Sequence, residues 1–174
     1  MAGIQINSLV NANVYNNGNS LLGKVEEIQL PAIKAKAVDV KALGMFMATE
    51  IPSGFEKMTG KMKWNAVYPD LIKEFGSPYS TKQIQVRGNL ESWDSSGRIS
   101  EVPVVAFLTV RFKDVMPAIT YKQNDNPEQE SEFSCSYYRL EIDGKKMIEV
   151  DAMANVFFIG DEDQLTKYRA NLGF

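Results

Sequence analysis

The sequence contains no histidine and a single cysteine among its 174 residues. The missing imidazole excludes nucleophiles activated by histidine, and it removes the side chain that is the commonest ligand of protein-bound metals. The lone thiol, Cys135, cannot form an internal disulfide. The lack of histidine thus excludes Ser-His-Asp and Cys-His nucleophile pairs and most zinc sites, which counts against an enzyme.

An excess of charge of one sign is also missing. Nineteen Lys and Arg against 22 Asp and Glu leave a net charge of -3, so the total charge does not indicate a protein that grips nucleic acid. The first ten residues lack the basic start and apolar run of a signal peptide, so we expect synthesis in the cytosol. With 44% hydrophobic and 24% charged residues, the composition is typical of one folded globular domain spanning residues 1–174.

The strongest pattern that is present is alternation with period two. In Lys82–Trp93 the residues Ile84, Val86 and Leu90 fall on one face, and polar residues fall on the other. A turn at residues 94–97 precedes a second alternating segment, Ile99–Lys113. These segments predict a long antiparallel hairpin.

Further strands are predicted on either side of this hairpin. The dipeptide Asp143-Gly144 tolerates the positive φ angles of a tight turn, and it predicts a second hairpin of Ser134–Ile142 with Lys146–Val150. Nearer the N-terminus, strands are expected at Asn11–Tyr15, Ser20–Leu30 and Lys57–Asn65.

Helix signals are few. Pro69 at a first-turn position and an apolar stripe predict a short helix at Pro69–Phe75. At the C-terminus, Asp161 and Gln164 resemble a capping box and predict a helix over residues 161–172. The expected fold is mainly β, with two packed antiparallel sheets in a sandwich or barrel-like arrangement and one or two short helices.

Two segments are predicted to be surface loops. Residues 38–55 carry Met45, Phe46 and Met47 between turn residues, which places large apolar side chains at the surface and suggests a partner. Residues 122–132 hold no apolar residue and are expected to be a solvated excursion. Trp93, beside a turn, is an expected interface residue, whereas Trp64 is expected in the core.

Candidate chemistry has a simpler structural explanation in each case. Cys135 alternates within a strand and is expected to be a small core residue. The cluster at residues 161–163 is expected to mark a helix N-terminus, where carboxylates are stabilised, because it lacks the pattern of a calcium loop. Glu26-Glu27 and the glutamates of residues 128–132 are expected on solvated faces. We therefore expect no catalytic residue, no cofactor and no metal.

Several short runs, in their order and spacing, resemble the major tail tube proteins of contractile-tailed bacteriophages. The clearest runs are Tyr137–Lys145, Ile148–Asp151 and the closing Tyr168–Gly173. Similar runs nearer the front are Val14-Tyr15, Gly23, Leu30-Pro31, Met62–Trp64 and Tyr68–Asp70. The resemblance covers nearly the whole chain, from about Asn13 to Phe174.

This resemblance implies a structural subunit of hexameric rings that stack into the inner tube of a contractile tail and form the conduit for DNA ejection. In that family two long hairpins per subunit join into one barrel of about 24 strands, and Lys82–Lys113 is expected to supply one of them. The expected lumen-lining residues are Gln83, Gln85, Arg87, Asn89, Glu91, Glu101, Thr109 and Arg111. The family's extended inter-ring loop corresponds here to residues 38–56, and the expected contact residues between subunits or rings are Met45, Phe46, Met47, Ile51, Phe55 and Trp93.

The resemblance also implies partners. They are further copies of the chain, the tail sheath, baseplate and tail terminator proteins, and, transiently in the lumen, the tape measure protein and DNA. The subunit itself is not expected to insert into a membrane, and it is expected in the virion tail after synthesis in the host bacterial cytoplasm. Residues 1–12 are expected to form an N-terminal arm.

Simple geometry agrees with a conduit. Strands about 4.8 Å apart and tilted by about 40° close about 24 strands into a circle roughly 50 Å across. The wall should be neutral or negative, so Lys57, Lys61 and Lys63 would conflict with it if they faced the bore without partners. Open alternatives are the tube of a headless contractile bacteriocin, a type VI-like injection tube and, more remotely, a β-rich hydrolase or carbohydrate-binding domain.

Overall fold

Strands dominate the computed structural model, which describes residues 4–174 and places 57% of those residues in strands. The elements are β1 (Ile6–Asn16), β2 (Asn19–Ser20), β3 (Val25–Gln29), β4 (Ala35–Val40), β5 (Thr49–Phe55), β6 (Met58–Trp64), α1 (Pro69–Phe75), β7 (Lys82–Asp94), β8 (Gly97–Phe112), β9 (Ile119–Thr120), β10 (Glu128–Ile142), β11 (Lys145–Asp151), β12 (Val156–Ile159), β13 (Glu162–Asp163) and α2 (Thr166–Leu172). The prediction of a mainly β fold with two antiparallel sheets and short helices is confirmed.

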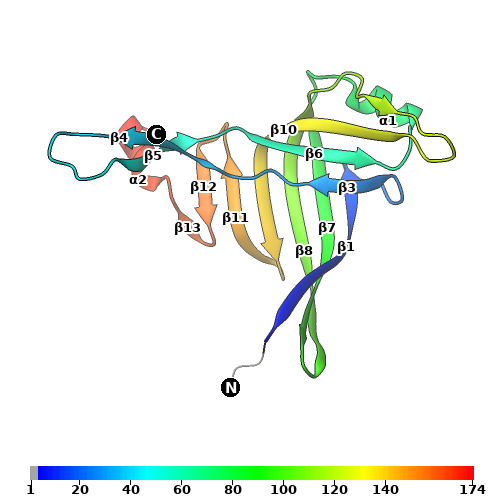
Figure 1. Ribbon diagram of the computed structural model, residues 1–174, viewed down its shortest axis with the longest axis horizontal. Coiled ribbons are helices and arrows are strands. Elements are labelled where there is room, and N and C mark those ends of the chain that lie inside the picture. Colours follow the sequence, from blue (N-terminus) through cyan, green and yellow to red (C-terminus); the bar gives the residue numbers. More distant parts are fainter. Residues whose placement is uncertain (1–3) are drawn as a thin grey trace.

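The larger sheet has eleven strands, and its main path runs β13-β12-β11-β10-β8-β7-β1-β2. Three further strands branch from it, because β6 pairs with β10, β3 pairs with β6, and β9 pairs with β10. Figure 1 shows the main path as a wall of neighbouring strands, with β6 and β3 running across it as a second layer. The smaller sheet is the hairpin β4–β5.

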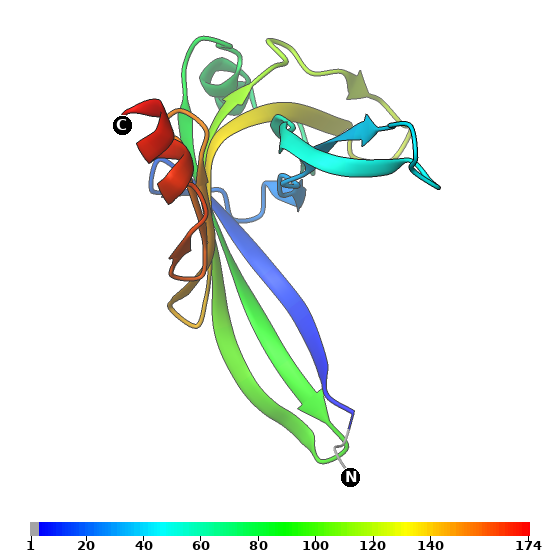
Figure 2. The ribbon, with the colours of Figure 1, turned by 90° about the vertical axis from the view of Figure 1, so that its left-hand side faces the viewer.

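Strand β10 joins the two layers. Its first half, from Gln129 to Cys135, pairs with β6, and its second half, to Ile142, pairs with β8 and β11. The register with β8 shifts between Cys135 and Tyr137, which is the position of a β-bulge. Figure 2 shows β10 curving from the wall into the second layer.

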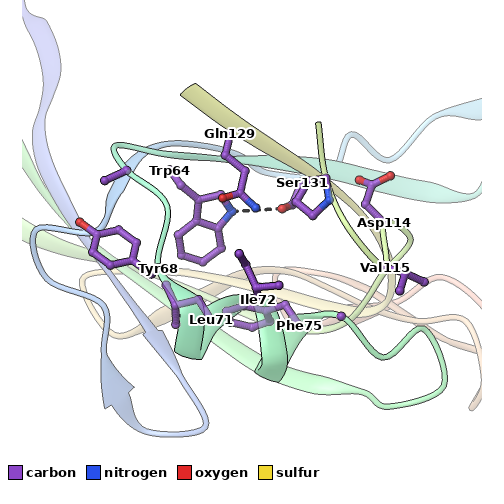
Figure 3. Close-up of a pocket in the computed structure, with 12 residues that line it drawn as sticks. Trp64, Tyr68, Leu71, Ile72, Phe75, Asp114, Val115, Gln129 and Ser131 are labelled. Atoms are coloured by element: carbon purple, nitrogen blue, oxygen red, sulfur yellow. Dashed lines mark hydrogen bonds between the residues drawn. The ribbon is translucent and has the colours of Figure 1, made fainter. Parts of the chain in front are cut away.

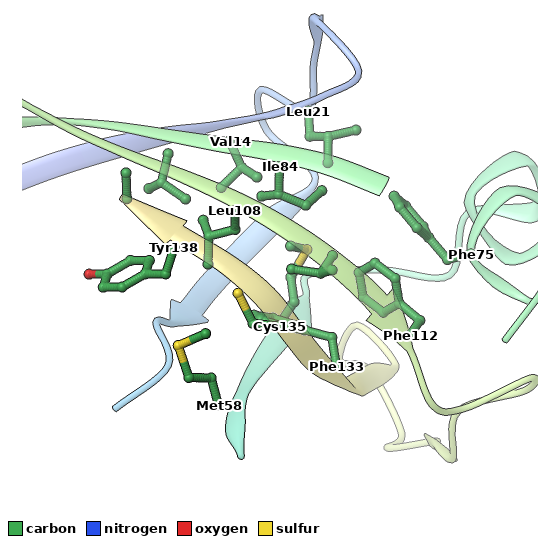
Figure 4. Packing of buried hydrophobic residues seen from close by; sticks show 14 of the residues in the cluster. Val14, Leu21, Met58, Phe75, Ile84, Leu108, Phe112, Phe133, Cys135 and Tyr138 are labelled. Carbon is green, nitrogen blue, oxygen red and sulfur yellow. The ribbon is translucent and has the colours of Figure 1, made fainter. Parts of the chain in front are cut away.

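The core lies between the wall and this second layer. Met58, Gly60, Met62 and Trp64 alternate inward from β6 as the sequence predicts, and all four are buried. Side chains of the wall, including Leu108 and Phe112, belong to the same buried cluster, and Figure 4 shows both beside Met58. Burying apolar surface at about 25 cal/mol per Å² makes this cluster the main source of stability.

Aromatic rings connect the core to helix α1. The ring of Phe75 in α1 lies 5.4 Å from Trp64 and 4.5 Å from Phe112, centroid to centroid. Figure 3 shows α1 under Trp64, whose Nε1 donates a 3.1 Å hydrogen bond to Ser131 Oγ. The space left beside α1 is about 10 Å³, enough for one water molecule at most. The helix predicted at Pro69–Phe75 is confirmed.

Both long hairpins are also confirmed. The turn after β7 is held by Asp94, whose Oδ1 accepts a 2.7 Å hydrogen bond from the Ser96 N–H. The turn between β10 and β11 places Asp143 at φ 53° and Gly144 at φ 71°, the left-handed conformations of a type I′ turn.

Three of these strands extend beyond the core. The outer parts of β1, β7 and β8 form a ribbon, which we call the arm, and Figure 2 shows it projecting below the rest of the molecule. Its apolar residues are exposed, with Ile6 at 62%, Leu9 at 57% and Ile99 at 53%. The arm therefore leaves apolar surface in water.

Two expectations near the N-terminus need correction. The first strand begins at Ile6 rather than Asn11. Most of the N-terminal segment predicted to be an arm, residues 1–12, is therefore strand paired with β7, and residues 1–3 lie outside the described residues. The single strand predicted over Ser20–Leu30 is two separate strands. Of these two strands, β2 pairs with β1, whereas β3 pairs with β6. The chain changes direction between them in a turn at residues 22–24.

The solvated excursion predicted at residues 122–132 is wrong in its second half, since β10 begins at Glu128. The inward positions there are Gln129 and Ser131, which are 5% and 4% exposed. Polar residues occupy the core face because Ser131 accepts the hydrogen bond of Trp64. Hydropathy alone could not reveal this strand.

The predicted C-terminal helix starts later than expected. Helix α2 begins at Thr166, its N-cap is Leu165, and no side chain caps it. Glu162 and Asp163 form β13, so a helix N-terminus does not explain the acidic cluster. Asp163 instead forms an ion pair with Arg169 of α2.

Residues 38–55, predicted as a loop, form most of a hairpin. Strands β4 and β5 pair from Ala35↔Phe55 to Val40↔Thr49, and the tip comprises residues 41–48. Two-residue periodicity is weak here because every residue of β5 is exposed.

Candidate functional site

The polar side of the wall carries most of the predicted site residues. Register places Gln83 beside Thr109, Gln85 beside Phe107, and Arg87 beside Val105. Directly opposite residues of an antiparallel pair share one face. The predicted residues of β7 and β8 therefore lie on one face, opposite the core.

The same face continues onto the second hairpin. Thr109 is opposite Tyr137, Phe107 is opposite Arg139, and on β11 Arg139 is opposite Glu149. We call the outward residues of β7, β8, β11 and the part of β10 from Tyr137 onward the polar wall face. It combines both long hairpins into one surface.

Hydrogen bonds join neighbouring strands across this face, and ion pairs form between residues of a single strand. Thr109 Oγ1 donates to Gln83 Oε1 at 3.1 Å, and Tyr137 Oη donates to Glu149 Oε1 at 2.9 Å. Glu149 Oε2 also lies 3.1 Å from Lys146 Nζ. Arg139 pairs with Glu141. Fixed side chains of both signs thus neutralise one another within the protomer.

Glu149 shows the balance of effects at the face. Burial alone would raise the pKa of its carboxyl, but hydrogen bonds from Tyr137 and Lys146 and their neighbouring charges bring the pKa below its ordinary value. Glu149 is thereby kept ionised. The pKa of Tyr137 is raised by burial and by the same hydrogen bond to Glu149.

The charged groups on the polar wall face balance in number. The cations are Arg87, Arg98, Arg111, Arg139 and Lys146, and the carboxylates are Glu91, Glu101, Glu141, Glu149 and Asp151. A face of this kind presents little net charge to a polyanion.

In the arm, the predicted lumen-lining residue Glu91 is buried rather than exposed to solvent. Glu91 is 8% exposed, because Arg98 Nη1 lies 2.9 Å from Glu91 Oε1 and Trp93 Nε1 donates to Glu91 Oε2 at 3.0 Å. Trp93 itself is 42% exposed at the end of the arm. Arg111, at the other end of the wall, lines a cleft with Ser134.

The lysines of β6 do not share the polar wall face. Lys61 and Lys63 point away from the core on the opposite layer, where Lys61 Nζ lies 2.7 Å from Glu130 and Lys63 Nζ lies 3.3 Å from Glu26. The hydrogen bond to each glutamate raises the pKa of each lysine. These cations therefore do not add positive charge to the wall.

The hairpin β4–β5 carries the other predicted contact residues. Phe46 is fully exposed, Met47 is 71% exposed and Ile51 is 52% exposed. Phe55 anchors the hairpin root, because its ring meets that of Phe157 edge to face at 5.1 Å. Met45 lies in the tip with Phe46.

Sequence reasoning missed part of the polar wall face. Tyr137, Arg139 and Glu141 alternate with apolar residues along β10, which predicts a half-exposed strand. Their position on the wall could not be predicted, because it depends on the long-range pairing of β10 with β8. Val105 and Phe107 are half-buried apolar residues on the same face. The wall is therefore less uniformly polar than its first hairpin suggested.

Cys135 is buried, as expected for a core residue, and lacks the environment of a nucleophile. Burial raises the pKa of its thiol to about 12. Among residues 4–174, no group of three or more acidic or thiol side chains is arranged to hold a metal ion. Neither of the two described helices is long and apolar enough to cross a membrane.

Comparisons with known proteins agree with the sequence resemblance. A family model described as phage tail tube protein FII matches residues 6–173. The tail tube protein of Escherichia phage P2 is 27% identical over 165 residues, which cover 92% of this chain and 94% of that protein.

Proposed function

The chain belongs to the phage tail tube protein FII family and is thus a structural subunit of a bacteriophage tail tube, and we propose that it closes into hexameric rings whose bore is lined by the polar wall face. The family is structural rather than enzymatic. The P2 relative comes from a phage with a contractile tail, which fits the resemblance noted in the sequence.

The single observation that carries the proposal is the form of the wall. Two long hairpins, β7–β8 and β10–β11, are adjacent in one sheet and present a charge-balanced face. A wall that conducts DNA must not hold phosphates by releasing their counterions, because each such contact would have to be broken as the DNA moves. The internal ion pairs of the face meet this requirement.

Open sheet edges support ring closure. From Ile6 to Val14, β1 has a partner strand on one side only among the described residues, and β13 at the other end has two residues. Unpaired edges promote pairing with other chains, and closing a barrel removes them. The proposed ring would join these two ends of neighbouring subunits.

The proposed assembly assigns the remaining partners by position. The tape measure protein and DNA would occupy the bore in turn, and the ends of the stack would meet the baseplate and tail terminator proteins. The layer of β6 and β3 would face outward to the sheath. The subunit, made in the host cytoplasm, would reside in the virion tail.

Negative-stain microscopy of the purified protein at high concentration tests the assembly. We expect rings or tubes with a central hole. A uniform monomer at every concentration would contradict the proposal.

The bore can be tested by adding charge to it. The double variant Gln83→Lys, Gln85→Lys places two cations on the polar wall face, and its tubes should retain a short DNA duplex in low salt and release it as salt rises. Wild-type tubes should retain none. Matched control tubes carry Gln29→Lys and Gln123→Lys, which add the same charge at exposed positions away from the wall. Equal retention by both variants would mean that the polar wall face does not line the bore.

A further inference from the structure

A stripe of apolar side chains interrupts the polar wall face. Pro103, Val105 and Phe107 are alternate residues of β8, so their side chains lie on one face of the strand. The intervening residue Ala106 and the next residue, Leu108, are buried in the core, which places these three side chains on the opposite side. Pro103 is exposed, and Val105 and Phe107 are half-buried. We call these three residues the apolar stripe.

The apolar stripe lies outside the core. None of its residues belongs to the core cluster or to the side chains packed against that cluster. Single apolar residues on a surface are normal, but three in succession on the outer side of a central strand leave a continuous strip of apolar surface in water. The stripe is therefore available to another molecule.

Long polar side chains border the stripe on both sides. Gln85 and Arg87 of β7 lie opposite stripe residues, and so do Arg139 and Glu141 of β10. Figure 1 shows these three strands side by side. Neighbouring strands are about 4.8 Å apart, so the two polar borders are roughly 10 Å apart. An α-helix with its side chains is about 10–12 Å across, which matches this width.

The spacing along β8 also suits a helix. Alternate residues of a strand are roughly 6.7 Å apart, and the apolar residues on one face of a helix recur about every 5.4 Å. The two spacings are close enough for side chains to interdigitate over three positions. Both edges of β8 are already paired, with β7 and β10. An extended peptide therefore cannot add to the sheet here, whereas a helix satisfies its own backbone.

The charges beside the stripe indicate the character of the partner's flank. Arg139 and Glu141 pair with each other. The guanidinium of Arg87 instead lies 5.8 Å from the centre of the Tyr15 ring, and within residues 4–174 no carboxylate pairs with it. An acidic side chain on the partner would complement this cation.

We propose that the apolar stripe binds an amphipathic helix of another protein, with the apolar face of the helix on the stripe and an acidic residue beside Arg87. The inference rests on the proposed function, because in the proposed ring the stripe faces the bore. The helix then belongs to a protein that lies in the bore. A DNA duplex presents a dense line of phosphates instead of an apolar face. The wall would thus hold a protein occupant and let DNA pass.

Repetition of the stripe compensates for its small size. Three side chains make a weak contact, but each ring of the proposed tube would carry six stripes, and stacked rings would repeat them. Linked weak contacts give a much stronger overall attachment than any one of them. An extended partner can therefore be retained in the bore and still leave, because its contacts break one after another.

Retention of a peptide probe by tubes tests the contact. The probe is a synthetic helix of about 40 residues, roughly 60 Å long, with leucines on one face, glutamates beside them, and alanine and glutamine elsewhere. Wild-type tubes should retain the probe when they are sedimented. Tubes of the double variant Val105→Gln, Phe107→Gln should retain at least about fivefold less, because the helix loses its apolar partners. The matched control, Leu22→Gln with Met153→Gln, replaces residues that are 76% and 85% exposed in turns outside the wall, and it should behave as wild type.

Equal retention by the two double variants, or no retention by wild-type tubes, would overturn the docking and leave the tube itself intact. Failure of the wild-type protein to form tubes would instead overturn the proposed function. The two failures are therefore distinguishable. Wild-type tubes that hold a short DNA duplex as firmly as the probe would overturn the distinction between occupants.

A second measurement removes no apolar surface, so it applies even if the double variant forms no tubes. Arg87→Gln should lower retention of the probe by at least about threefold. It should not affect a second probe in which glutamines replace the glutamates. The control Lys36→Gln removes a cation from an exposed position of β4 and should change neither. Unchanged retention of the glutamate probe by Arg87→Gln, or an equal loss of both probes, would overturn the proposed orientation of the helix.

Discussion

Gly60 illustrates how tightly one residue position is constrained by the meeting of two strands. A Cβ built there would lie 2.5 Å from the backbone oxygen of Gln29 in β3 and 2.5 Å from the ring of Phe133. The absence of a side chain is what lets β3 and the core approach from opposite sides of β6.

We predict that Gly60→Ala lowers the free energy of unfolding by about 1–3 kcal/mol, because an added methyl forces these neighbours apart. Urea denaturation of the free subunit measures it. Thr59→Ala, at the outward-facing neighbouring position, is the control and should change stability much less. A Gly60→Ala protein as stable as wild type would show that β3 is displaced without cost.

Cys135 gives the fold a dependence on alkaline pH. Its folded pKa of about 12 lies above the ordinary value of 9.0, so folding disfavours the thiolate. The stabilising contribution is complete below pH 9 and is lost as the pH rises from 9 toward 12. Raised pKa values at Tyr137 and Tyr138 act in the same direction above their ordinary value of 10.

We therefore expect the urea midpoint of the free subunit to fall between about pH 8 and pH 10.5. Cys135→Ala should show a smaller fall, because it retains a small apolar side chain and lacks the titrating thiol. The comparison is between pH slopes, since the substitution changes stability at every pH. Identical slopes for the two proteins would rule out Cys135 as a contributor.

Among the elements, helix α2 has no buried residue, and the side chain of Arg169 joins it to the rest of the chain. Arg169 Nη1 donates a 2.8 Å hydrogen bond to the backbone oxygen of Asn155, and the same guanidinium pairs with Asp163. The hydrogen bonds from Arg169, the Leu165 N–H and Thr166 lower the pKa of Asp163.

Arg169→Met should release α2 while leaving the core folded. We expect amide hydrogen exchange over residues 163–174 to accelerate by about tenfold or more, with no change in β6. Lys167→Met, on the same helix, is the matched control. Unchanged exchange in Arg169→Met would mean that other contacts hold the helix.

Element prediction from sequence succeeded where one face of a strand is apolar. Ile84 and Val86 alternate with Gln83 and Gln85, so period two is visible along β7. It failed at the start of β10, where Gln129 and Ser131 are buried and satisfy their polarity inside the core.

The candidate site divides in the same way. Which side chains of β7 and β8 share a face follows from alternation and a turn. That β10 lies beside β8 depends on the pairing of Tyr137 with Thr109, residues separated by a helix-free stretch that includes β9 and its loops. No local pattern contains such information, so the full width of the wall required the structure.

At the scale of the whole molecule, the arm is the part of a free subunit whose apolar residues are not covered by other parts of the chain. Its apolar residues, including Ile6, Leu9 and Trp93, are exposed, and Figure 2 shows the arm extending beyond the second layer. Exposed apolar surface of this extent on a strand ribbon is typical of an assembly surface.

Assembly should protect this ribbon. We predict that amide exchange in residues 6–10 and 93–99 slows by at least about tenfold in tubes relative to the free subunit, whereas β6 changes little because it is already in the core. Hydrogen exchange with mass spectrometry of both samples measures the difference. Equal exchange in the two states would show that the arm stays open in the tube.

Strand β10 also has a mechanical consequence for such a tube. Because one uninterrupted backbone pairs with β8 and β11 in the wall and with β6 in the second layer, a push on one layer reaches the other through covalent bonds. Two separate sheets would transmit the same load only through side-chain contacts, which slide far more easily than a polypeptide stretches. In the proposed tube, the subunit would therefore resist shear between the bore and the outer surface.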